Sequence, residues 1–297
     1  MTSLVRELKE AGIFPKKSLG QNFLIDREVA QRIVHLAPLN PEDIVVEIGP
    51  GLGVLTFPML QRVKKVVAVE LDRKMVDYLR DKGEGITSLV VVYRDALQFD
   101  FLGLAQEAGR KLKVVANLPY NISNPIIFRL LECREALTYL TLMLQQEVAQ
   151  RITSPPGSRD YGPLSIFVQL YTSPKILMRV SPHAFYPQPK VESALVGFEI
   201  LEHPRVEIGD MGFFQGVVRA SFAQRRKTIL NSLKNYPLAL GSSEEIKEGL
   251  EAVGIDPRRR AETLDLVEFK RLAEALRELN QDDDSSLSRK IVGTRLT

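Results

Sequence analysis

The sequence contains a single cysteine, Cys133, and three histidines among its 297 residues. One cysteine excludes an intrachain disulfide and suits a reducing compartment, so we expect a cytoplasmic protein. Because Cys133 lies in a stretch with a helical pattern, we expect a buried thiol rather than a nucleophile. His35, His183 and His203 share no ligand spacing with each other or with the cysteine, which argues against metal catalysis.

Long apolar runs are also absent. The first residues have no apolar signal region, and no stretch reaches the length of a membrane span, so we expect no membrane association. A hydrophobic share of 44% and a charged share of 26% are typical of a soluble globular protein. The length of 297 residues suggests about two domains.

The net charge is only +3, and the excess of positive charge lies in the first 200 residues. The remainder is balanced but carries two clusters of cations, Arg225-Arg226-Lys227 and Arg258-Arg259-Arg260. Clustered cations suit a chain of phosphates, although such runs also occur as ordinary solvated faces. Both interpretations stay open for the two clusters.

Strand-like and helical patterns alternate through the first two thirds of the chain. This alternation implies βαβ units and a mostly parallel sheet. Two later strand-like runs, 175–180 and 194–200, flank a connector that is stiffened by three prolines. The five earlier apolar runs that predict strands are 43–48, 66–69, 89–92, 114–116 and 139–144.

After residue 203 the pattern changes to amphipathic helices alone. Helices predicted at 213–234, 244–253 and 266–279 indicate a small all-helical domain. Residues 281–297 are polar and charged, so we expect a disordered tail there. The predicted division of the chain is therefore 1–203, 204–280 and 281–297.

Gly49-Pro50-Gly51-Leu52-Gly53 directly follows the first strand and precedes a helical pattern. Glycines at alternate positions let the backbone turn tightly and approach a ligand closely, with helix amides facing it. In the nicotinamide-dinucleotide fingerprint the third glycine comes three residues after the second, but that position is Val54 here. The departure argues against a pyrophosphate ligand.

Acidic residues stand at the ends of the next two strands. Glu70 comes about twenty residues after the glycine loop, a position from which a carboxylate binds ribose hydroxyls. Its alternative role is that of a solvated carboxylate at a strand end. Asp95 either accepts a hydrogen bond from an exocyclic amine or caps a turn.

The strand at 114–116 runs into Asn117-Leu118-Pro119-Tyr120 and stops because Pro119 removes a ladder donor. Ligands of open α/β sheets bind at this edge, and an amide beside an aromatic ring suits a flat nucleobase. The alternative is a turn with a capping Asn and a buried Tyr. Two other features are equally open. The leader at 14–24 is either floppy or folded over a ligand, and Phe185 either fills a gap in the core or stacks on a ligand.

Together these motifs resemble the class I S-adenosylmethionine-dependent methyltransferases, and more narrowly the KsgA (RsmA) family of small-subunit rRNA adenine dimethyltransferases. The resemblance implies a Rossmann-like α/β domain followed by a small helical domain. Its sheet would be mostly parallel and seven-stranded, with an antiparallel strand. The resemblance runs from Lys16 to about Leu279 and rests on six segments in order, 19–24, 47–53, 117–120, 185–191, 221–228 and 260–264.

The same resemblance implies roles for individual residues. S-adenosyl-L-methionine would be the methyl donor, and two adjacent adenosines near the 3′ end of 16S rRNA would each receive two methyl groups. The donor would be bound by Gln21, Asn22, Leu24, Gly49, Gly51, Gly53, Glu70, Leu71, Asp95, Ala96 and Asn117. Catalysis would use Asn117, Leu118, Pro119, Tyr120 and Phe185, and RNA would contact Arg225, Arg226 and Lys227.

The chemistry of adenine N6 fits the residues at 117–120. The exocyclic amine is a poor nucleophile because its lone pair is delocalised into the ring. The Asn117 side-chain oxygen and the Leu118 carbonyl can accept its two hydrogens, while Tyr120 and Phe185 can pack on the two faces of a base removed from its stack. No strong base is needed, so most of the acceleration would come from alignment of the reacting groups.

Three other functions stay open. A large-subunit rRNA adenine methyltransferase of the macrolide-resistance type shares the core motifs, although segment 260–264 and the length of the helical domain favour the small-subunit enzyme. A DNA adenine methyltransferase is disfavoured because no separate sequence-reading domain is evident. A non-catalytic RNA-binding assembly factor would need only the basic cluster at 225–227. We expect a monomer whose role in subunit assembly accompanies methylation.

Overall fold

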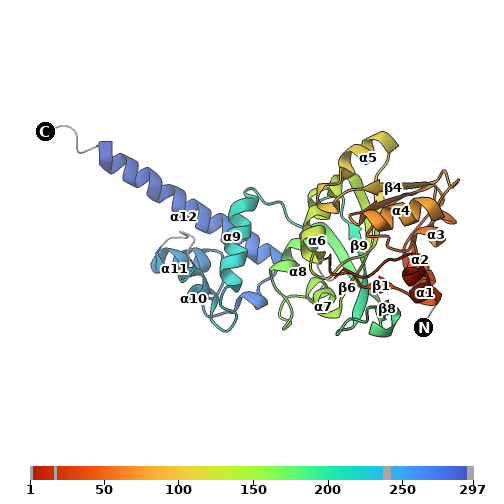
Figure 1. Cartoon of the computed structure of the whole chain (residues 1–297). Helices are drawn as coiled ribbons and strands as arrows, with labels where there is room; N and C mark the ends of the chain where they lie inside the picture. The colour runs from red at the N-terminus through yellow and green to blue at the C-terminus, as the bar shows by residue number, and fades with distance from the viewer. Residues whose placement is uncertain (1–2, 17–18, 237–241, 293–297) are drawn as a thin grey trace. The chain divides into compact units, whose positions relative to one another are not determined.

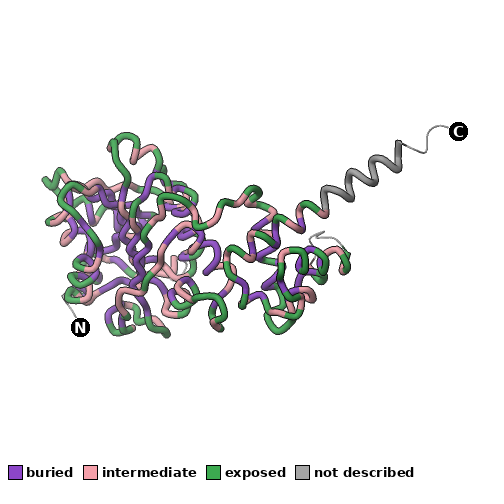
Figure 2. The backbone as a smooth tube through the Cα atoms, turned by 180° about the vertical axis from the view of Figure 1, so that it is seen from behind, coloured by how far each residue is buried: buried purple, intermediate pink, exposed green. Residues whose placement is uncertain are grey.

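The computed structural model describes residues 3–16, 19–236 and 242–292, with side chains for 4–16, 19–236 and 242–279. The chain divides into two compact units. The first comprises the residues up to Thr153 together with Tyr171–His203, and the second comprises Ser154–Leu170 together with the chain from Pro204 onward. Each unit has its own set of buried residues (Figure 2).

A seven-stranded sheet forms the centre of the first unit (Figure 1). Every neighbouring pair of strands is parallel except the two pairs that include β9 (Ser193–Ile200), which confirms the predicted sheet. In spatial order its strands are β4 (Leu89–Tyr93), β3 (Lys65–Glu70), β2 (Ile44–Ile48), β5 (Leu112–Asn117), β6 (Leu137–Gln145), β9 and β7 (Thr172–Val180).

Valine-rich and isoleucine-rich strands occupy the middle of this sheet because helices cover both of its faces. All five residues of β2 and five of the six residues of β3 are buried. The thiol of Cys133, directly after α6, is buried as predicted. The helices of this part of the chain are α2 (Arg27–Leu36), α3 (Thr56–Leu60), α4 (Arg73–Lys82), α5 (Phe101–Ala108), α6 (Ser123–Glu132) and α7 (Gln146–Thr153).

The direction in which the chain crosses the sheet changes between β2 and β5. From β2 the chain continues to its neighbour β3, whereas from β5 it continues to β6 on the other side. A crevice opens at the carboxyl ends of two such strands, and ligands of α/β sheets bind there. The glycine loop at 49–53 leaves β2 at this point, and residues 118–120 leave β5.

The leader and the proline-rich connector pair with each other in a small two-stranded sheet. Its strands are β1 (Phe23–Leu24) and β8 (Phe185–Tyr186), with Phe23 opposite Tyr186 and Leu24 opposite Phe185. The Ile25 N–H extends the pairing to the Ala184 carbonyl at 2.8 Å. Upstream of the leader, α1 (Ser3–Glu10) packs in the same core cluster as Phe23. The described part of the leader is thus folded, and its strand partner lies far along the chain.

The second unit is helical. Residues 154–170, which the sequence assigns to the first domain, belong here instead. The reason is aromatic packing, because Tyr161 and Phe167 meet Phe222 and Phe214 edge-on with ring centroids 6.3 Å apart in each pair. The principal helices of this part of the chain are α8 (Pro163–Tyr171), α9 (Met211–Phe222), α10 (Ile229–Lys234), α11 (Ser243–Ala252) and α12 (Leu266–Val292).

The helix predicted at 213–234 is wrong, because the structure has two helices there. α9 ends at Phe222, and α10 begins after Thr228, whose hydroxyl accepts a hydrogen bond from the Asn231 N–H. A threonine side chain competes in this way with a continuous helix. The turn between the two helices exposes residues 225–227.

The disordered tail predicted for 281–297 is also wrong over part of its length. α12 continues through Val292, and residues 293–297 lie outside the described chain. Once a helix has nucleated, each further residue adds one backbone hydrogen bond, so polar residues can extend it. The sequence predicts the helix at 266–279, but the polar composition of the segment after it does not reveal that the helix continues.

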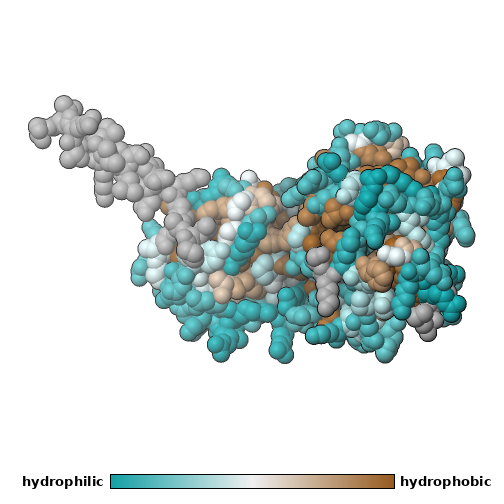
Figure 3. Space-filling view, viewed as in Figure 1, coloured by the Kyte–Doolittle hydropathy of each residue, from teal (hydrophilic) through white to brown (hydrophobic). Residues whose placement is uncertain are grey.

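The face seen in Figure 3 is mainly hydrophilic, and hydrophobic side chains reach it only in limited areas. Phe14 and Leu71 are among the exposed large hydrophobic residues. In the described part of the chain, no helix combines the length and the apolar character needed to cross a bilayer. Nor do three or more His, Cys, Asp or Glu residues gather within the described ranges in a group that could hold a metal ion.

Candidate active site

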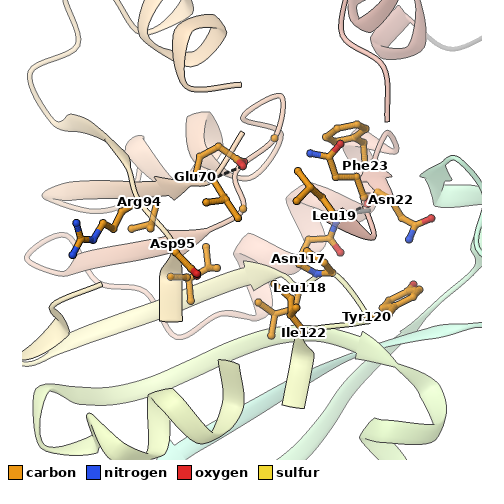
Figure 4. A pocket seen from close by; sticks show the side chains of 18 residues that line it. Leu19, Asn22, Phe23, Glu70, Arg94, Asp95, Asn117, Leu118, Tyr120 and Ile122 are labelled. Carbon is orange, nitrogen blue, oxygen red and sulfur yellow. Dashed lines mark hydrogen bonds between the residues drawn. The ribbon is translucent and has the colours of Figure 1, made fainter. Parts of the chain in front are cut away.

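A cavity lies at the carboxyl ends of β2, β3, β4 and β5, in the predicted crevice (Figure 4). The glycine loop, the strand ends and the leader form its walls, so three of the sequence motifs meet at one place. The cavity is lined by Leu19, Gln21, Asn22, Phe23, Ile48, Gly49, Gly51, Val69, Glu70, Leu71, Arg94, Asp95, Ala96, Asn117, Leu118, Pro119, Tyr120 and Ile122.

The glycine loop forms one wall of the cavity because two of its residues have no side chain and adopt left-handed backbone angles. φ is +67° at Gly49 and +52° at Gly51. A Cβ atom on Gly51 would approach the ring of Phe23 to 3.0 Å, so a larger residue would push against the leader. Gly53, with φ of +77°, is not a lining residue, because it packs against Phe57 and Leu79. A glycine at position 53 is therefore needed for the packing of the loop against these two side chains.

Glu70 is the last residue of β3, and its carboxylate is held by backbone amides. Its Oε1 accepts hydrogen bonds from the N–H groups of Leu71 and Asp72, both at 2.8 Å. Burial raises the pKa of Glu70 despite these amides and that of Gly51, which favour the ionised form. The carboxylate is thus positioned before any ligand arrives, and Leu71 lines the cavity beside it.

Glu47 is a second buried acid near the glycine loop. Its side chain accepts a hydrogen bond from the Thr56 hydroxyl. Burial raises the pKa of Glu47 to about 8, and the nearby charge of Glu70 acts in the same direction. The carboxyl lines a small cavity next to the main one, together with Gly49 and Asn117. Sequence reasoning assigns no site role to Glu47.

Asp95 and Ala96 follow β4 and line the cavity. The Asp95 Oδ1 accepts a hydrogen bond from the Leu97 N–H at 2.9 Å and so caps a short 3₁₀ helix, Ala96–Gln98. Of the two roles that the sequence leaves open, the capping role is observed, and it holds the carboxylate at the cavity wall. A ligand amine can still reach an oxygen of this carboxylate, because each oxygen has more than one acceptor site.

Asn117 is the last residue of β5, and a contact with the leader fixes its amide. Its Nδ2 donates to the Asn22 carbonyl at 3.0 Å (Figure 4). A carbonyl can only accept, so the NH₂ group faces Asn22 and Oδ1 remains as the acceptor of the amide. Leu118 and Pro119 continue the wall of the cavity.

Tyr120 is anchored at its hydroxyl. The oxygen lies 2.6 Å from the Ser193 Oγ at the start of β9. Burial raises the pKa of Tyr120, while the Ser193 hydrogen bond opposes that rise. The ring lines the cavity, which is its expected position. Ser193 has no sequence signal, because the partner strand that brings it here is distant in the chain.

Two predicted site residues lie in the core instead of the cavity. Phe185 has 3% of its surface exposed and belongs to one buried cluster with Leu24. Neither is among the residues that line the main cavity. The pairing of β1 with β8 places both side chains in this cluster, whereas Tyr186 packs with a different one. Of the two alternatives for Phe185, filling the core is the observed one.

A family model described as ribosomal RNA adenine dimethylase matches residues 14–277. The chain belongs to this family. The Ribosomal RNA small subunit methyltransferase A of Geobacter metallireducens is 45% identical over 91% of this chain and 98% of its own length. The protein of the same name from Magnetococcus marinus is 46% identical over 90% of this chain and 93% of its own. The predicted family is confirmed.

Solved structures agree with this dimethylase family. A dimethyladenosine transferase from Plasmodium falciparum superposes with a TM-score of 0.73 at 26% identity, over 86% of this chain and 97% of its own. The 23S rRNA methyltransferase ErmE gives a TM-score of 0.63 at 27% identity, over 86% and 99%. Both structures support the Rossmann-like enzyme fold followed by helices.

The basic cluster of this family member, residues 225–227, is exposed in the turn between α9 and α10. Within the described side chains, none of the three cations forms an ion pair with an acid. The second cluster differs, because Arg258 pairs with Asp256 at 3.1 Å and Arg259 pairs with Glu268. Of the two clusters, both of which lie in the described chain, the first is therefore the one that presents unpaired positive charge.

Some lining residues of this dimethylase cavity carry no motif signal of their own. Ile48 and Val69 sit at the carboxyl ends of β2 and β3, so the rule that ligands bind at strand ends could have found them. Leu19 and Phe23 lie in the leader motif without an assigned role. The other two lining residues without an assigned role are Arg94 and Ile122.

Proposed function

We propose that this chain transfers methyl groups from S-adenosylmethionine to the N6 amines of adenosines in rRNA. The observation that carries the proposal is the amide of Asn117, which is fixed at the cavity wall with Oδ1 as its remaining acceptor. The specific targets that we propose are two adjacent adenosines near the 3′ end of 16S rRNA. We further propose that a monomer acts in the cytoplasm on the small subunit or its precursor and contributes to assembly.

The cavity fits a nucleoside that carries an amino-acid tail. Gly49 and Gly51 leave room for close approach by a ligand, and the backbone holds the Glu70 carboxylate for ribose hydroxyls. Asp95 and the Ala96 backbone would bind the adenine. Bound S-adenosylmethionine would supply a methyl group activated by a positively charged sulfur.

The protein groups around the target amine would act by orientation. The Asn117 Oδ1 and the Leu118 carbonyl would accept the two N6 hydrogens, which directs the nitrogen lone pair towards the methyl group. A neutral amide is sufficient, because the proton becomes acidic only as the nitrogen turns cationic. Tyr120, fixed at its hydroxyl by Ser193, would pack on one face of the base. Correct alignment can lower the barrier by roughly 7–11 kcal/mol.

The second transfer to the same nitrogen places a further demand on the pocket. After one methyl group is attached, only one hydrogen remains for the two acceptors. The monomethylated amine must therefore rotate while the base stays in position. A pocket wall built from Leu118 and Pro119, which lack side-chain hydrogen-bonding groups, does not oppose that rotation.

The substrate proposal rests on the relatives, because the curated proteins at 45–46% identity carry the name of a small-subunit methyltransferase. The competing substrate is large-subunit rRNA, since ErmE is described as a 23S rRNA methyltransferase. The higher identity to the curated small-subunit methyltransferases, 45–46% against 27% for ErmE, favours the first substrate.

Incubation with labelled S-adenosylmethionine and unmethylated small subunits, followed by nucleoside analysis, tests the proposal. We expect N6,N6-dimethyladenosine to form at two adjacent positions of 16S rRNA. Parallel incubation with unmethylated large-subunit rRNA and with adenine-containing DNA gives the controls. Label that appears only in 23S rRNA would support the competing substrate. Absence of transfer to any nucleic acid, with RNA binding retained, would support a non-catalytic assembly factor.

A further inference from the structure

Residues 19–24 of the leader are tied to the rest of the first unit on both sides. Downstream, the β1–β8 pairing holds Phe23 and Leu24. Upstream, the Leu19 N–H donates to the Lys16 carbonyl at 3.1 Å, and the Lys16 Nζ lies 2.8 Å from the Asp72 Oδ2. The part of the leader that lines the cavity therefore lies between a strand pair and an ion pair.

Asp72 is connected to more than Lys16. Its Oδ2 also accepts a long hydrogen bond from the Gln21 Nε2 at 3.4 Å, and the Gln21 Oε1 accepts from the Lys16 N–H at 2.9 Å. Its Oδ1 caps α4 by accepting from the Lys74 N–H at 3.2 Å. One carboxylate thus joins the leader to the helix that follows β3.

The backbone of Asp72 reaches the other side of the cavity wall. Its N–H donates to the Glu70 Oε1 at 2.8 Å. Asp72 therefore links two parts of the proposed donor site, the leader through its side chain and the ribose carboxylate through its main chain. A substitution of the Asp72 side chain therefore removes the link to the leader and keeps the backbone link to Glu70.

Burial makes the ion pair necessary. The Asp72 side chain is only 3% exposed, whereas that of Lys16 is 48% exposed. A buried carboxylate needs an opposite charge and hydrogen-bond donors. Burial alone would raise the pKa of Asp72, but the hydrogen bond and charge of Lys16 outweigh it and hold the pKa below its ordinary value. The Asp72 carboxylate is fixed at the start of α4, so its pairing with Lys16 sets the position of the leader.

We propose that Asp72 is a positioning residue for the methyl donor, because it holds the leader across the cavity through Lys16 and Gln21. This proposal rests on the proposed function, since it assumes that S-adenosylmethionine binds in this cavity. Gln21 and Asn22 line the cavity, so a loosened leader weakens one wall of the donor site. A donor bound behind such a wall dissociates faster.

Two substitutions remove the charge of the pair with little other change. Asp72→Asn keeps an acceptor for the Lys74 N–H and the backbone N–H to Glu70, and asparagine is a good helix N-cap. Lys16→Met keeps most of the side-chain length at a half-exposed position. Calorimetry gives the donor dissociation constant, stopped-flow mixing gives the dissociation rate, and steady-state assays separate kcat from KM for the donor.

We expect each variant to raise the donor dissociation constant and dissociation rate by about tenfold, or about 1.4 kcal/mol, because the loosened leader no longer closes one wall of the site. We expect kcat at saturating donor to change by less than about threefold, because the β1–β8 pairing still holds the chain next to Asn22, whose carbonyl orients Asn117. The double variant should be no weaker than the more affected single variant, since both remove the same interaction.

The ion pair of Lys113 and Asp43 is the matched control. Its atoms lie 2.7 Å apart, and it joins β5 to the residue that precedes β2, at the amino ends of the strands away from the cavity. Asp43→Asn should lower the melting temperature without changing donor affinity. An equal loss of donor affinity in Asp43→Asn would mean a general effect on stability and would overturn the role of Asp72.

Unchanged donor affinity and dissociation in folded Asp72→Asn and Lys16→Met would also overturn the proposal. If Asp72→Asn does not fold, Lys16→Met decides the question alone. The wild-type protein provides the separate check on function. If it does not bind S-adenosylmethionine, the proposed function fails, whereas donor binding that is insensitive to both substitutions rejects only the role of Asp72.

Discussion

At the scale of single residues, the orientation of Asn117 depends on the leader. Its NH₂ group is committed to the Asn22 carbonyl at 3.0 Å, which leaves Oδ1 as the acceptor of the amide. An acceptor that is oriented before the substrate arrives costs no reorganisation during the reaction. The leader therefore orients the proposed catalytic amide and also forms part of the cavity wall.

Asn117→Ala tests that role. We expect methyl transfer to fall by at least about 100-fold, the usual loss when a positioned polar group at a reaction centre is removed. Donor affinity, measured by calorimetry, should change much less, because the glycine loop and Glu70 are untouched. Asn124→Ala on the exposed start of α6 is the control. Activity near that of the wild type would reject the role of Asn117.

The raised pKa of buried Glu47 makes us expect that the stability of the protein depends on pH. Burial raises its pKa from an ordinary 4.5 to about 8, so the folded protein keeps a proton that the unfolded chain loses in that window. Stability from this group is therefore fully present below about pH 4.5 and is lost as the pH rises to about 8. Glu47→Gln imitates the protonated carboxyl and can still accept from Thr56.

The variant should match the wild type near about pH 5 and exceed its melting temperature by several degrees near about pH 8.5. The measurement is thermal unfolding of donor-free protein across this range. Glu84→Gln, at an exposed position, should show no such trend. A difference between Glu47→Gln and wild type that stays constant with pH would contradict the buried, protonated state.

Substitutions of Phe185 distinguish a structural role of its ring from a base-stacking role. Its ring is 3% exposed within the core, so Phe185→Ala should cost about 3–5 kcal/mol of unfolding free energy. Phe185→Leu should keep most of the stability and most of the methyl transfer. Denaturant unfolding and the methylation assay give the two quantities. Loss of transfer in a stable Phe185→Leu protein would restore the stacking role.

At the scale of elements, the turn between α9 and α10 is an exposed basic surface. Its three cations at 225–227 lack acidic partners among the described side chains, whereas Arg258 pairs with Asp256. Unpaired cations on a turn can approach phosphates without first breaking an ion pair. The turn is therefore the better of the two candidates for rRNA contact.

Replacement of Arg225, Arg226 and Lys227 by alanine should weaken binding to small-subunit rRNA. We expect the slope of log affinity against log salt to become shallower by up to about 3, or about one unit for each phosphate that the protein no longer neutralises. Fluorescence anisotropy at several salt concentrations measures it. Arg258→Ala should have a smaller effect. An rRNA affinity that does not change with salt concentration would exclude the turn as an rRNA-binding surface. So would an affinity that the triple substitution leaves unchanged.

At the scale of the whole molecule, the chain crosses between its two units more than once. Residues 154–170 leave the first unit, join the second, and return the chain to β7. Tyr161 and Phe167 are buried there against Phe222 and Phe214. A cut after His203, where the sequence suggests a boundary, removes the partners of both aromatic rings.

A fragment of residues 1–203 should therefore expose apolar surface. Exposure of each ring would cost roughly 1.5–3 kcal/mol of stabilisation by the hydrophobic effect. We expect stronger binding of a hydrophobic dye and a greater tendency to aggregate than in the full chain. The same fragment with Tyr161→Ser and Phe167→Ser should bind less dye. Equal dye binding by the two fragments would mean that this segment does not depend on the second unit.

Much of the fold and site was predictable, because it depends on local patterns. The Val-rich runs of β2 and β3 alternate with helices, and that alternation requires parallel crossovers. Glycines at 49 and 51, Glu70 and the segment at 117–120 each stand at a strand end, and strand ends of a parallel sheet meet at one edge. The sequence by itself therefore determined the sheet, its ligand-binding edge and the family.

Tertiary structure decided what depends on partners distant in the chain. The sequence leaves Phe185 open between the core and a ligand, and the resemblance assigns Leu24 to the donor, but the pairing of their strands places both side chains in the core. The pairing of Asn117 with Asn22 and of Lys16 with Asp72 likewise joins segments with no common periodicity. Local sequence patterns report which residues share a face of one element. They do not report which elements meet, because that is set by packing of the whole chain.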